Sequence, residues 1–345
     1  TSPSFSYSMT PSRRASNNMT ISIIIVYTNG TPLENYETAL NSVECYAKLH
    51  GYILHLFSDA TYNECAKHND LFFRRHCCIA KFMRSEIKHN SWCLVLDGDI
   101  AVVNPNILIE KFIDADYDIT LFDRFFNFEV GANSYLVRNT DRGRAFVQRF
   151  ADYEFKLPKS FHGTDNGALH PYLAELLAPE NARFVDVLCA KIWRDSKNYK
   201  TLFDMEVCTR LVFGDRTHFP EEKLRILPKG KSWVRDVWLL KNRWADDDFM
   251  LHAVKEKQLV QLGPEIKTTI PDSQLYQWDP THDEKRTFPV VQKLNIFKCE
   301  LGEEQWIYDS RLKISNEKKA TLLYYMEAKI FKKRLEVIGR IARDL

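Results

Sequence analysis

The chain has 345 residues, of which 45% are hydrophobic and 27% charged, and its formal net charge is +2 at pH 7. This is a globular composition, long enough for one large α/β domain or two ordinary ones, and it excludes a wholly disordered chain or a membrane-embedded protein. The near-neutral charge gives no reason to expect nucleic acid as a partner.

The eight cysteines contain no CxxC pair, which argues against a structural zinc site. Cys93 lies in an apolar segment and is predicted to be a buried free thiol. The others are compatible with disulfides formed in an oxidising lumen, but the sequence leaves their pairing open. Sequons at Asn18 and Asn29 favour a secretory setting weakly.

Residues 1–19 are rich in Ser, Pro, Asn and Arg and are predicted to form a disordered arm or stem. The β-branched run 21–27 predicts a buried strand. A helical pattern follows, with Tyr36, Leu40, Val43 and Ala47 on one stripe, and it stops at a glycine, residue 51. Residues 52–57 predict the next strand, so the chain opens with a βαβ unit and a parallel sheet.

A second helix is predicted over residues 75–88 and a third strand over residues 92–96, which ends on Asp97. Further on, the apolar patterns predict a helix over residues 143–153 and three strands, over residues 118–122, 134–138 and 184–188.

Residues 316–344 predict one long amphipathic helix, capped by Ser315. Its other face is basic. Packing of this helix on its own domain is the favoured interpretation, and a homodimer contact or a membrane-surface helix are the alternatives. The apolar stripe consists of Leu322, Leu323, Met326, Ile330, Leu335, Ile338 and Ile341.

Asp97, Gly98 and Asp99 come directly after the third predicted strand. Ligands of open α/β sheets bind beyond the carboxyl ends of the strands, where these two acids are expected. Hard oxygen ligands suit Mn²⁺ or Mg²⁺, which keep positions for phosphates. The glycine is expected to let the backbone turn tightly and a ligand approach. The alternative to a metal site is an ordinary solvated turn.

Three further segments carry residues of the same chemistry. The run 72–81 (FFRRHCCIAK) offers Arg74, Arg75, His76 and Lys81 to a diphosphate, or presents them on a solvated helix face. The run 161–170 (FHGTDNGALH) places Asp165 and Asn166 after Thr164, either beside the donor sugar or as first-turn residues of a helix that Thr164 caps. The run 249–255 (FMLHAVK) offers His252 as a third metal ligand.

The order of these motifs resembles the GT-A glycosyltransferases. More closely, the segments 72–76 (FFRRH), 157–168 (LPKSFHGTDNGA) and 248–252 (DFMLH) resemble a nematode-expanded family catalogued as domain of unknown function 273, over about residues 21–262. That family is in turn similar to the galactosyl, mannosyl and xylosyl transferases of glycosyltransferase family 34.

The resemblance implies a GT-A fold with a mostly parallel central sheet flanked by helices, in a catalytic domain over residues 20–262, followed by a C-terminal extension over residues 263–345. It implies a Mn²⁺- or Mg²⁺-dependent hexosyl- or pentosyltransferase that retains the anomeric configuration. The donor is a nucleotide-diphosphate sugar, with a UDP-sugar favoured, and the acceptor is a glycan or glycoconjugate. The expected location is the Golgi or secretory lumen, as a type II membrane protein whose anchor is missing from this sequence.

Carried over by position, Asp97, Asp99 and His252 match the metal ligands, and Asp165 and Asn166 match the catalytic element near the donor sugar. Residues expected to contact the nucleotide-sugar are Tyr27, Thr28, Asp59, Arg75, Lys81, Gly98 and Lys255. One departure concerns the residues after His252: relatives commonly have a glycine-bearing loop there, whereas this chain has Ala253, Val254 and Lys255.

Two other functions are compatible with the sequence. Residues 95–99 (VLDGD) also resemble the first motif of haloacid-dehalogenase-type phosphatases, and Asp246, Asp247 and Asp248 resemble their later acidic motif. Against this, a full βαβ unit precedes the first motif here. The second alternative is a catalytically inactive sugar-binding module.

A further segment could bind the acceptor. Residues 231–238, with Trp233, Arg235, Asp236 and Trp238, are expected either to contact an acceptor sugar or, for the tryptophans, to pack in the core.

Overall fold

The computed structural model describes residues 4–7, 19–260 and 285–343. Its main sheet has seven strands in the order β3-β2-β4-β7-β6-β9-β8, and all run in the same direction except β7 and β8. The strands are β2 (Ile21–Tyr27), β3 (Ile53–Ser58), β4 (Trp92–Leu96), β6 (Ile119–Phe122), β7 (Ser134–Arg138), β8 (His218–Phe219) and β9 (Leu224–Leu227).

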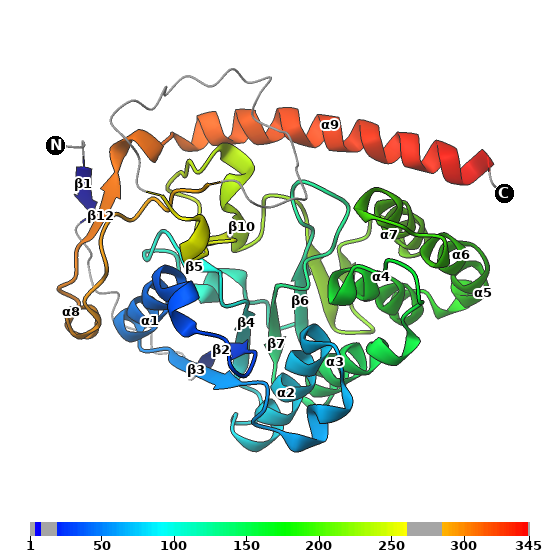
Figure 1. Ribbon diagram of the computed structural model, residues 1–345, viewed down its shortest axis with the longest axis horizontal. Coiled ribbons are helices and arrows are strands. Elements are labelled where there is room, and N and C mark those ends of the chain that lie inside the picture. Colours follow the sequence, from blue (N-terminus) through cyan, green and yellow to red (C-terminus); the bar gives the residue numbers. More distant parts are fainter. Residues whose placement is uncertain (1–3, 8–18, 261–284, 344–345) are drawn as a thin grey trace.

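Helices cover both faces of this sheet (Figure 1). Side chains that alternate along β4 enter two different cores: Leu94 and Leu96 join the cluster that includes α1, whereas Cys93 and Val95 join the cluster that includes α2, α3 and α4. The helices are α1 (Glu37–His50), α2 (Leu71–Ser85), α3 (Asp141–Asp152), α4 (Thr164–Leu177), α5 (Ala182–Phe184), α6 (Ala190–Arg194) and α7 (Tyr199–Phe213). The expected mixed α/β fold, with a mostly parallel central sheet flanked by helices, is confirmed.

Local sequence signals account for several of these boundaries. The helix α1 stops at Gly51, whose φ of 68° is the left-handed conformation that favours glycine. Asp70 caps α2 by accepting a hydrogen bond from the backbone N–H of Phe72 at 2.8 Å. The third strand, β4, is buried along its whole length, as its apolar run predicts.

The strand predicted over residues 184–188 is wrong. This segment continues α5 as a π-helical stretch, Val185–Cys189, and then as α6. Val185 and Leu188 are buried whereas Val187 is 64% exposed, which is the burial pattern of a helix. A short apolar run cannot by its composition distinguish a strand from a buried helical segment.

A second, three-stranded sheet is formed by β10 (Val234–Asp236), β11 (Met250–His252) and β5 (Ala101–Val102). The middle strand, β11, is parallel to β10 and antiparallel to β5. Because β5 follows β4 after only four residues, this small sheet brings distant segments of the chain to the carboxyl end of β4.

The C-terminal part consists of α8 (Ile296–Leu301), β12 (Trp306–Asp309) and the long α9 (Asn316–Arg343). Within residues 1–19, expected to be disordered, the structure describes a strand β1 (Ser4–Tyr7) paired with β12, and residues 1–3 and 8–18 lie outside the described residues. Ser315 caps α9 as predicted, since its hydroxyl accepts the backbone N–H of Lys318 at 3.1 Å. No helix in the described part of the chain is long and apolar enough to cross a lipid bilayer.

Three disulfides link described cysteines: Cys45–Cys299, Cys65–Cys77 and Cys189–Cys208. Cys93 is a buried free thiol, as predicted, and so is Cys78. The expected packing of α9 on its own domain is confirmed for Leu322, Leu323, Met326, Ile330 and Ile341, which are buried against the rest of the chain. Leu335, expected on the same stripe, is instead 53% exposed.

Candidate metal centre

Asp97, Asp99 and His252 converge where β4 ends and β11 returns beside it. One ligand atom from each residue lies within 4.8 Å of the others. The backbone fixes this arrangement: β11 pairs with β5, and the N–H of Val254 donates to the carbonyl oxygen of Asp99 at 2.9 Å. Two carboxylates and one imidazole at this spacing form a donor set that suits Mn²⁺ or another divalent cation.

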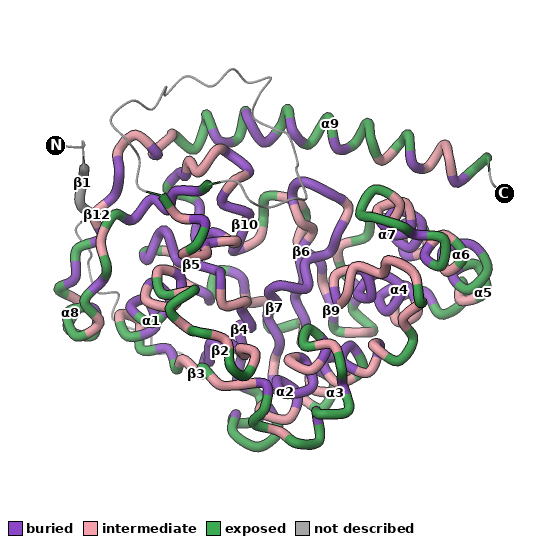
Figure 2. The backbone as a smooth tube through the Cα atoms, in the orientation of Figure 1, coloured by how far each residue is buried: buried purple, intermediate pink, exposed green. Residues whose placement is uncertain are grey.

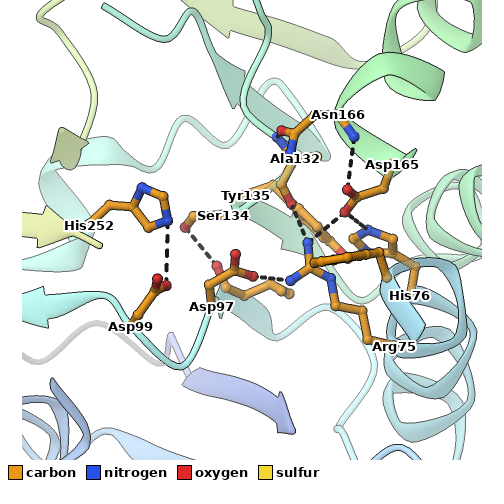
Figure 3. A network of polar contacts seen from close by, with 12 residues as sticks. Arg75, His76, Asp97, Asp99, Ala132, Ser134, Tyr135, Asp165, Asn166 and His252 are labelled. Atoms are coloured by element: carbon orange, nitrogen blue, oxygen red, sulfur yellow. Dashed lines mark hydrogen bonds and ion pairs between the residues drawn. The ribbon is translucent and has the colours of Figure 1, made fainter. Parts of the chain in front are cut away.

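His252 is oriented by Asp236. The two residues are register partners in the β10–β11 pair, and the Asp236 carboxylate lies 2.8 Å from His252 Nδ1. The other ring nitrogen, Nε2, points toward Asp99 at 3.4 Å (Figure 3). A carboxylate that holds Nδ1–H leaves Nε2 available as a ligand, which is the usual arrangement around metal-binding histidines.

The electrostatics of the three ligands differ. Burial alone would lower the pKa of His252, but the carboxylates of Asp99 and Asp236 outweigh it and raise the pKa to about 9. Burial would raise the pKa of Asp99, but His252 and Lys255 hold it well below its usual value. Burial, together with Asp99, raises the pKa of Asp97 to about 6, against the opposing effect of Arg75. A bound divalent cation would replace the proton on His252 and compensate the buried carboxylates.

Arg75 connects this centre to Asp165 (Figure 3). Its guanidinium pairs with Asp97 on one side and with the Asp165 carboxylate at 2.6 Å on the other. Asp165 is fully buried and also lies 3.2 Å from His76 Nε2. Burial would raise the pKa of Asp165, but Arg75 and His76 hold it well below the usual range. Asp165 therefore positions Arg75, and its predicted catalytic role stays a prediction.

The loop that delivers Asp165 has an unusual backbone. Gly163 and Thr164 have φ values of 69° and 52°, and the left-handed region is costly for a β-branched threonine. Gly163, not Thr164, precedes the helix, so the predicted Thr164 cap is wrong. Backbone strain such as that at Thr164 persists where surrounding structure holds it, commonly at functional sites.

Asn166, in the first turn of α4, is only partly buried, and its side-chain oxygen accepts the N–H of Ala132 at 3.4 Å.

A cavity of about 200 Å³ adjoins the acidic residues. Its lining includes the acids Asp97 and Asp99 and six of the seven residues expected to contact the nucleotide-sugar. These six are Tyr27, Thr28, Asp59, Arg75, Gly98 and Lys255. Sequence reasoning missed two aromatic members of its lining, Tyr36 and Phe72. An apolar cleft with a few convergent polar groups is the usual form of a small-molecule site.

Two lining residues have specific contacts. Lys255 Nζ lies 3.3 Å from the Asp99 carboxylate and remains 38% exposed, so it can turn toward an anion. Asp59 is 3% exposed, and one of its oxygens accepts the N–H of Asn29 at 2.8 Å. The other oxygen lies 3.7 Å from the Arg74 guanidinium and has no hydrogen-bond donor among the described residues.

Three expectations about individual residues need correction. Lys81 lies outside this cavity, on the side of α2 that faces Glu64, 4.0 Å away, because the helix turns it from the stripe that faces the site. His76 is fully buried and bonded to Asp165, so it cannot reach a diphosphate. Gly98 does not adopt a left-handed conformation, and an added Cβ would meet Tyr36 only at 3.9 Å, so the chain turns here without needing glycine.

Of the residues proposed for acceptor binding, Trp233 is a core residue. It is 1% exposed and donates its indole N–H to Ser134 at 2.8 Å. Asp236 is also buried, and besides His252 it contacts Arg124, whose guanidinium continues to Glu129. No sequence signal marks Asp236 as the partner of His252, since only the register of two three-residue strands brings them together.

The turn after His252 carries Ala253 where relatives are expected to have a glycine-bearing loop. The φ of this alanine is 71°, the conformation in which glycine is most readily accommodated. The turn is fixed on both sides, because Arg286 donates to the Ala253 carbonyl oxygen at 2.8 Å and Val254 bonds Asp99. The chain therefore carries alanine at a turn whose backbone conformation favours glycine.

Among solved structures, the chain is similar to a glycosyltransferase involved in glycosylation of the major capsid of PBCV-1, with 16% identity and a TM-score of 0.36, over 68% of this chain and 93% of that chain. It is also similar to the apo-form glycosyltransferase GlyE of Streptococcus pneumoniae TIGR4, with 15% identity and a TM-score of 0.31, over 45% of this chain and 43% of that one. A further structure of GlyE shows 15% identity and a TM-score of 0.30, over 57% of this chain and 64% of that one.

No curated protein matches the chain significantly. A family model described as "Protein of unknown function, DUF273" matches residues 43–268, which include every residue of the metal centre. Because this match spans more than half of the sequence, the chain belongs to the DUF273 family.

Proposed function

We propose that this chain is a divalent-metal-dependent glycosyltransferase that moves a hexose or pentose from a nucleotide-diphosphate sugar to a glycan or glycoconjugate acceptor. The observation that carries the proposal is the convergence of Asp97, Asp99 and His252 at the edge of the cavity that Tyr27, Asp59 and other predicted donor contacts line. A Mn²⁺ or Mg²⁺ ion held by this triad would stabilise the charge that develops on the leaving diphosphate.

The chain's own residues have separate roles in this proposal. Lys255 adds a positive charge beside Asp99 and binds the diphosphate. Asp236 keeps His252 in the orientation that exposes Nε2. The buried Asp59 has a carboxylate oxygen that pairs with Arg74 at 3.7 Å but accepts no hydrogen bond from the described residues, so it can accept an N–H of the nucleobase, which agrees with a uridine donor.

We favour transfer with retention on the same face of the sugar. The acceptor oxygen bonds to the anomeric carbon, the bond to the diphosphate breaks, and the hydroxyl proton passes to the departing phosphate oxygen. A double displacement through Asp165 is less favoured, because Arg75 and His76 enclose that carboxylate. Asn166 is better placed than Asp165 to bind a hydroxyl of the donor sugar, since it is only partly buried.

The relation to glycosyltransferase family 34 and a Golgi or secretory-lumen location as a type II membrane protein belong to the same proposal.

The phosphatase alternative is less favoured for a geometric reason. Asp246 and Asp247 pair with Lys313 and Lys319, and Asp248 pairs with Arg235. Asp247 and Asp248 line a different pocket from Asp97. The later acidic motif of a phosphatase would need to share the site of the first.

The test is a thermal-shift and hydrolysis panel of UDP- and GDP-sugars with and without Mn²⁺. A donor present at 100 times its Kd should stabilise the fold by about 2.7 kcal/mol. Mn²⁺-dependent hydrolysis of that donor should fall at least about 100-fold in Asp97→Asn and in His252→Ala. As a control, Asp204→Asn removes a carboxylate that pairs with Arg340 instead, and should keep full activity.

A panel without any stabilising donor would overturn the proposal. Donor binding without hydrolysis or transfer would favour the inactive binding module, and hydrolysis of an aryl phosphate that depends on Asp97 would favour the phosphatase.

A further inference from the structure

The helix α9 carries apolar side chains on two opposite sides. The inner side packs on the domain, as described above, and the helix lies along the outer edge of the molecule (Figure 1). Burial alternates along it, and its outward turns are exposed (Figure 2). On the outward side, Tyr324 is 70% exposed, Phe331 58% and Leu335 53%. Large aromatic side chains aligned on an exposed helix face are typical of an interaction surface.

The spacing of these residues is specific. We define the outer seam as Tyr324, Ala328, Phe331, Leu335, Ile338 and Ala342, whose separations alternate between four and three residues. Such a repeat has a period of 3.5 residues and is the a/d pattern of a coiled-coil contact. The seam is exposed at Tyr324, Ala328, Phe331, Leu335 and Ala342, whereas Ile338 is half-buried against the inner cluster that includes Val337 and Ile341.

The charges beside the seam match a second copy of the same helix. With Ala328 and Leu335 at a positions and Tyr324 and Phe331 at d positions, Glu327 occupies a g position and Lys332 the e position five residues later. In a parallel pair, these are the two positions that meet across the interface. Both side chains are exposed, so Glu327 of each helix can pair with Lys332 of its neighbour. An anionic lipid surface fits less well, because Glu327 and Glu336 are exposed on the same helix.

We propose that two copies of this chain form a homodimer through a parallel, in-register pairing of their outer seams. This inference is independent of the proposed glycosyltransferase activity. The helix has 28 residues and is about 42 Å long, which gives each copy room for five successive steps of the repeat.

The first experiment measures mass by light scattering coupled to size exclusion. The wild-type chain should have twice its monomer mass of 40.5 kDa at micromolar concentration. The triple variant Tyr324→Ser, Phe331→Ser, Leu335→Ser should have the monomer mass and an unchanged circular dichroism spectrum, because these side chains are more than half exposed. The matched control Phe297→Ser removes a side chain that is 69% exposed on α8, and it should leave the dimer intact.

The second experiment tests orientation. Ala328→Cys should form an inter-chain disulfide on mild oxidation, since equivalent a positions face each other in a parallel pair, whereas Lys333→Cys, at an f position on the side of the helix away from the seam, should not. Glu327→Lys and Lys332→Glu should each weaken the dimer severalfold, and the double variant should restore it.

A monomeric wild type would overturn the proposal, as would a triple variant that remains dimeric. Sedimentation of monomers with phosphatidylserine vesicles, lost in the triple variant, would overturn it in favour of a lipid surface. Because neither experiment measures catalysis, failure here leaves the glycosyltransferase proposal untouched.

Discussion

At the scale of single residues, Asp236 and His252 show how strand register determines the chemistry of a side chain. The parallel pairing of β10 and β11 places the Asp236 carboxylate against Nδ1 of the imidazole and directs Nε2 toward Asp99. The carboxylate is in turn held by Arg124 at 2.8 Å. The contact is therefore part of a buried network that leaves the imidazole little rotational freedom.

Asp236→Asn should weaken Mn²⁺ binding by about 10- to 100-fold, because the amide no longer fixes the imidazole orientation as the carboxylate does. Isothermal titration of Mn²⁺ into the purified chain measures the effect. Asp248→Asn is the matched control: it removes a buried carboxylate from an ion pair with Arg235 and Lys319, so it should lower the stability but leave the Mn²⁺ affinity intact. Equal losses of affinity in both variants would mean that Asp236 has only a structural role.

At the scale of secondary-structure elements, the apolar runs predicted the strands that carry the site. The segments 21–27 and 92–96 are short, β-branched or continuously apolar, and bounded by polar residues. Their residue pattern and their length therefore both indicate strands. The position of the two acids beyond β4 followed from the same pattern. The segment 184–188 gave the same local signal but lies in a helical region linked to α7 by the Cys189–Cys208 disulfide, which no short window contains.

The parts of the site that could not be predicted depend on long-range packing. Asp236 and His252 meet only because two three-residue strands pair side by side. Lys81 and Arg75 are six residues apart on the same helix and point about 120° apart, so only the packing of the helix decides which of them faces the acids. Likewise Leu335 fits the apolar period of α9 but belongs to its outer side.

Ala253 gives a prediction for the turn that ends β11. An alanine with a φ of 71° is strained by roughly 1–2 kcal/mol relative to glycine, whose greater freedom in the unfolded chain offsets part of this. Ala253→Gly should therefore raise the free energy of unfolding by about 0.5–1 kcal/mol, measured by urea denaturation. Ala145→Gly, inside α3, should lower it by about the same amount. A loss of stability in Ala253→Gly would show that the turn tolerates alanine without strain.

At the scale of the whole molecule, the C-terminal part shares the core of the sheet. Phe288, Leu294 and Trp306 belong to the same buried cluster as Ile23 of β2 and Val43 of α1. The Cys45–Cys299 disulfide joins α1 to α8 within that cluster. Residues 285–343 are therefore expected to unfold together with the sheet and not as an attached independent unit.

The Cys45–Cys299 disulfide should contribute more stability than Cys189–Cys208. Both pairs are almost fully buried, but they are separated by 254 and 19 residues respectively, and the chain-entropy cost of closing a loop grows with its length. Replacing Cys45 and Cys299 by alanine should cost about 2 kcal/mol more than replacing Cys189 and Cys208, in urea denaturation followed by tryptophan fluorescence. Each variant should retain a single transition. If the C-terminal part packs in a common core with the sheet, the two lose structure together. An additional early transition, seen only in the Cys45/Cys299 variant, would instead show that the covalent link alone holds the C-terminal part to the sheet.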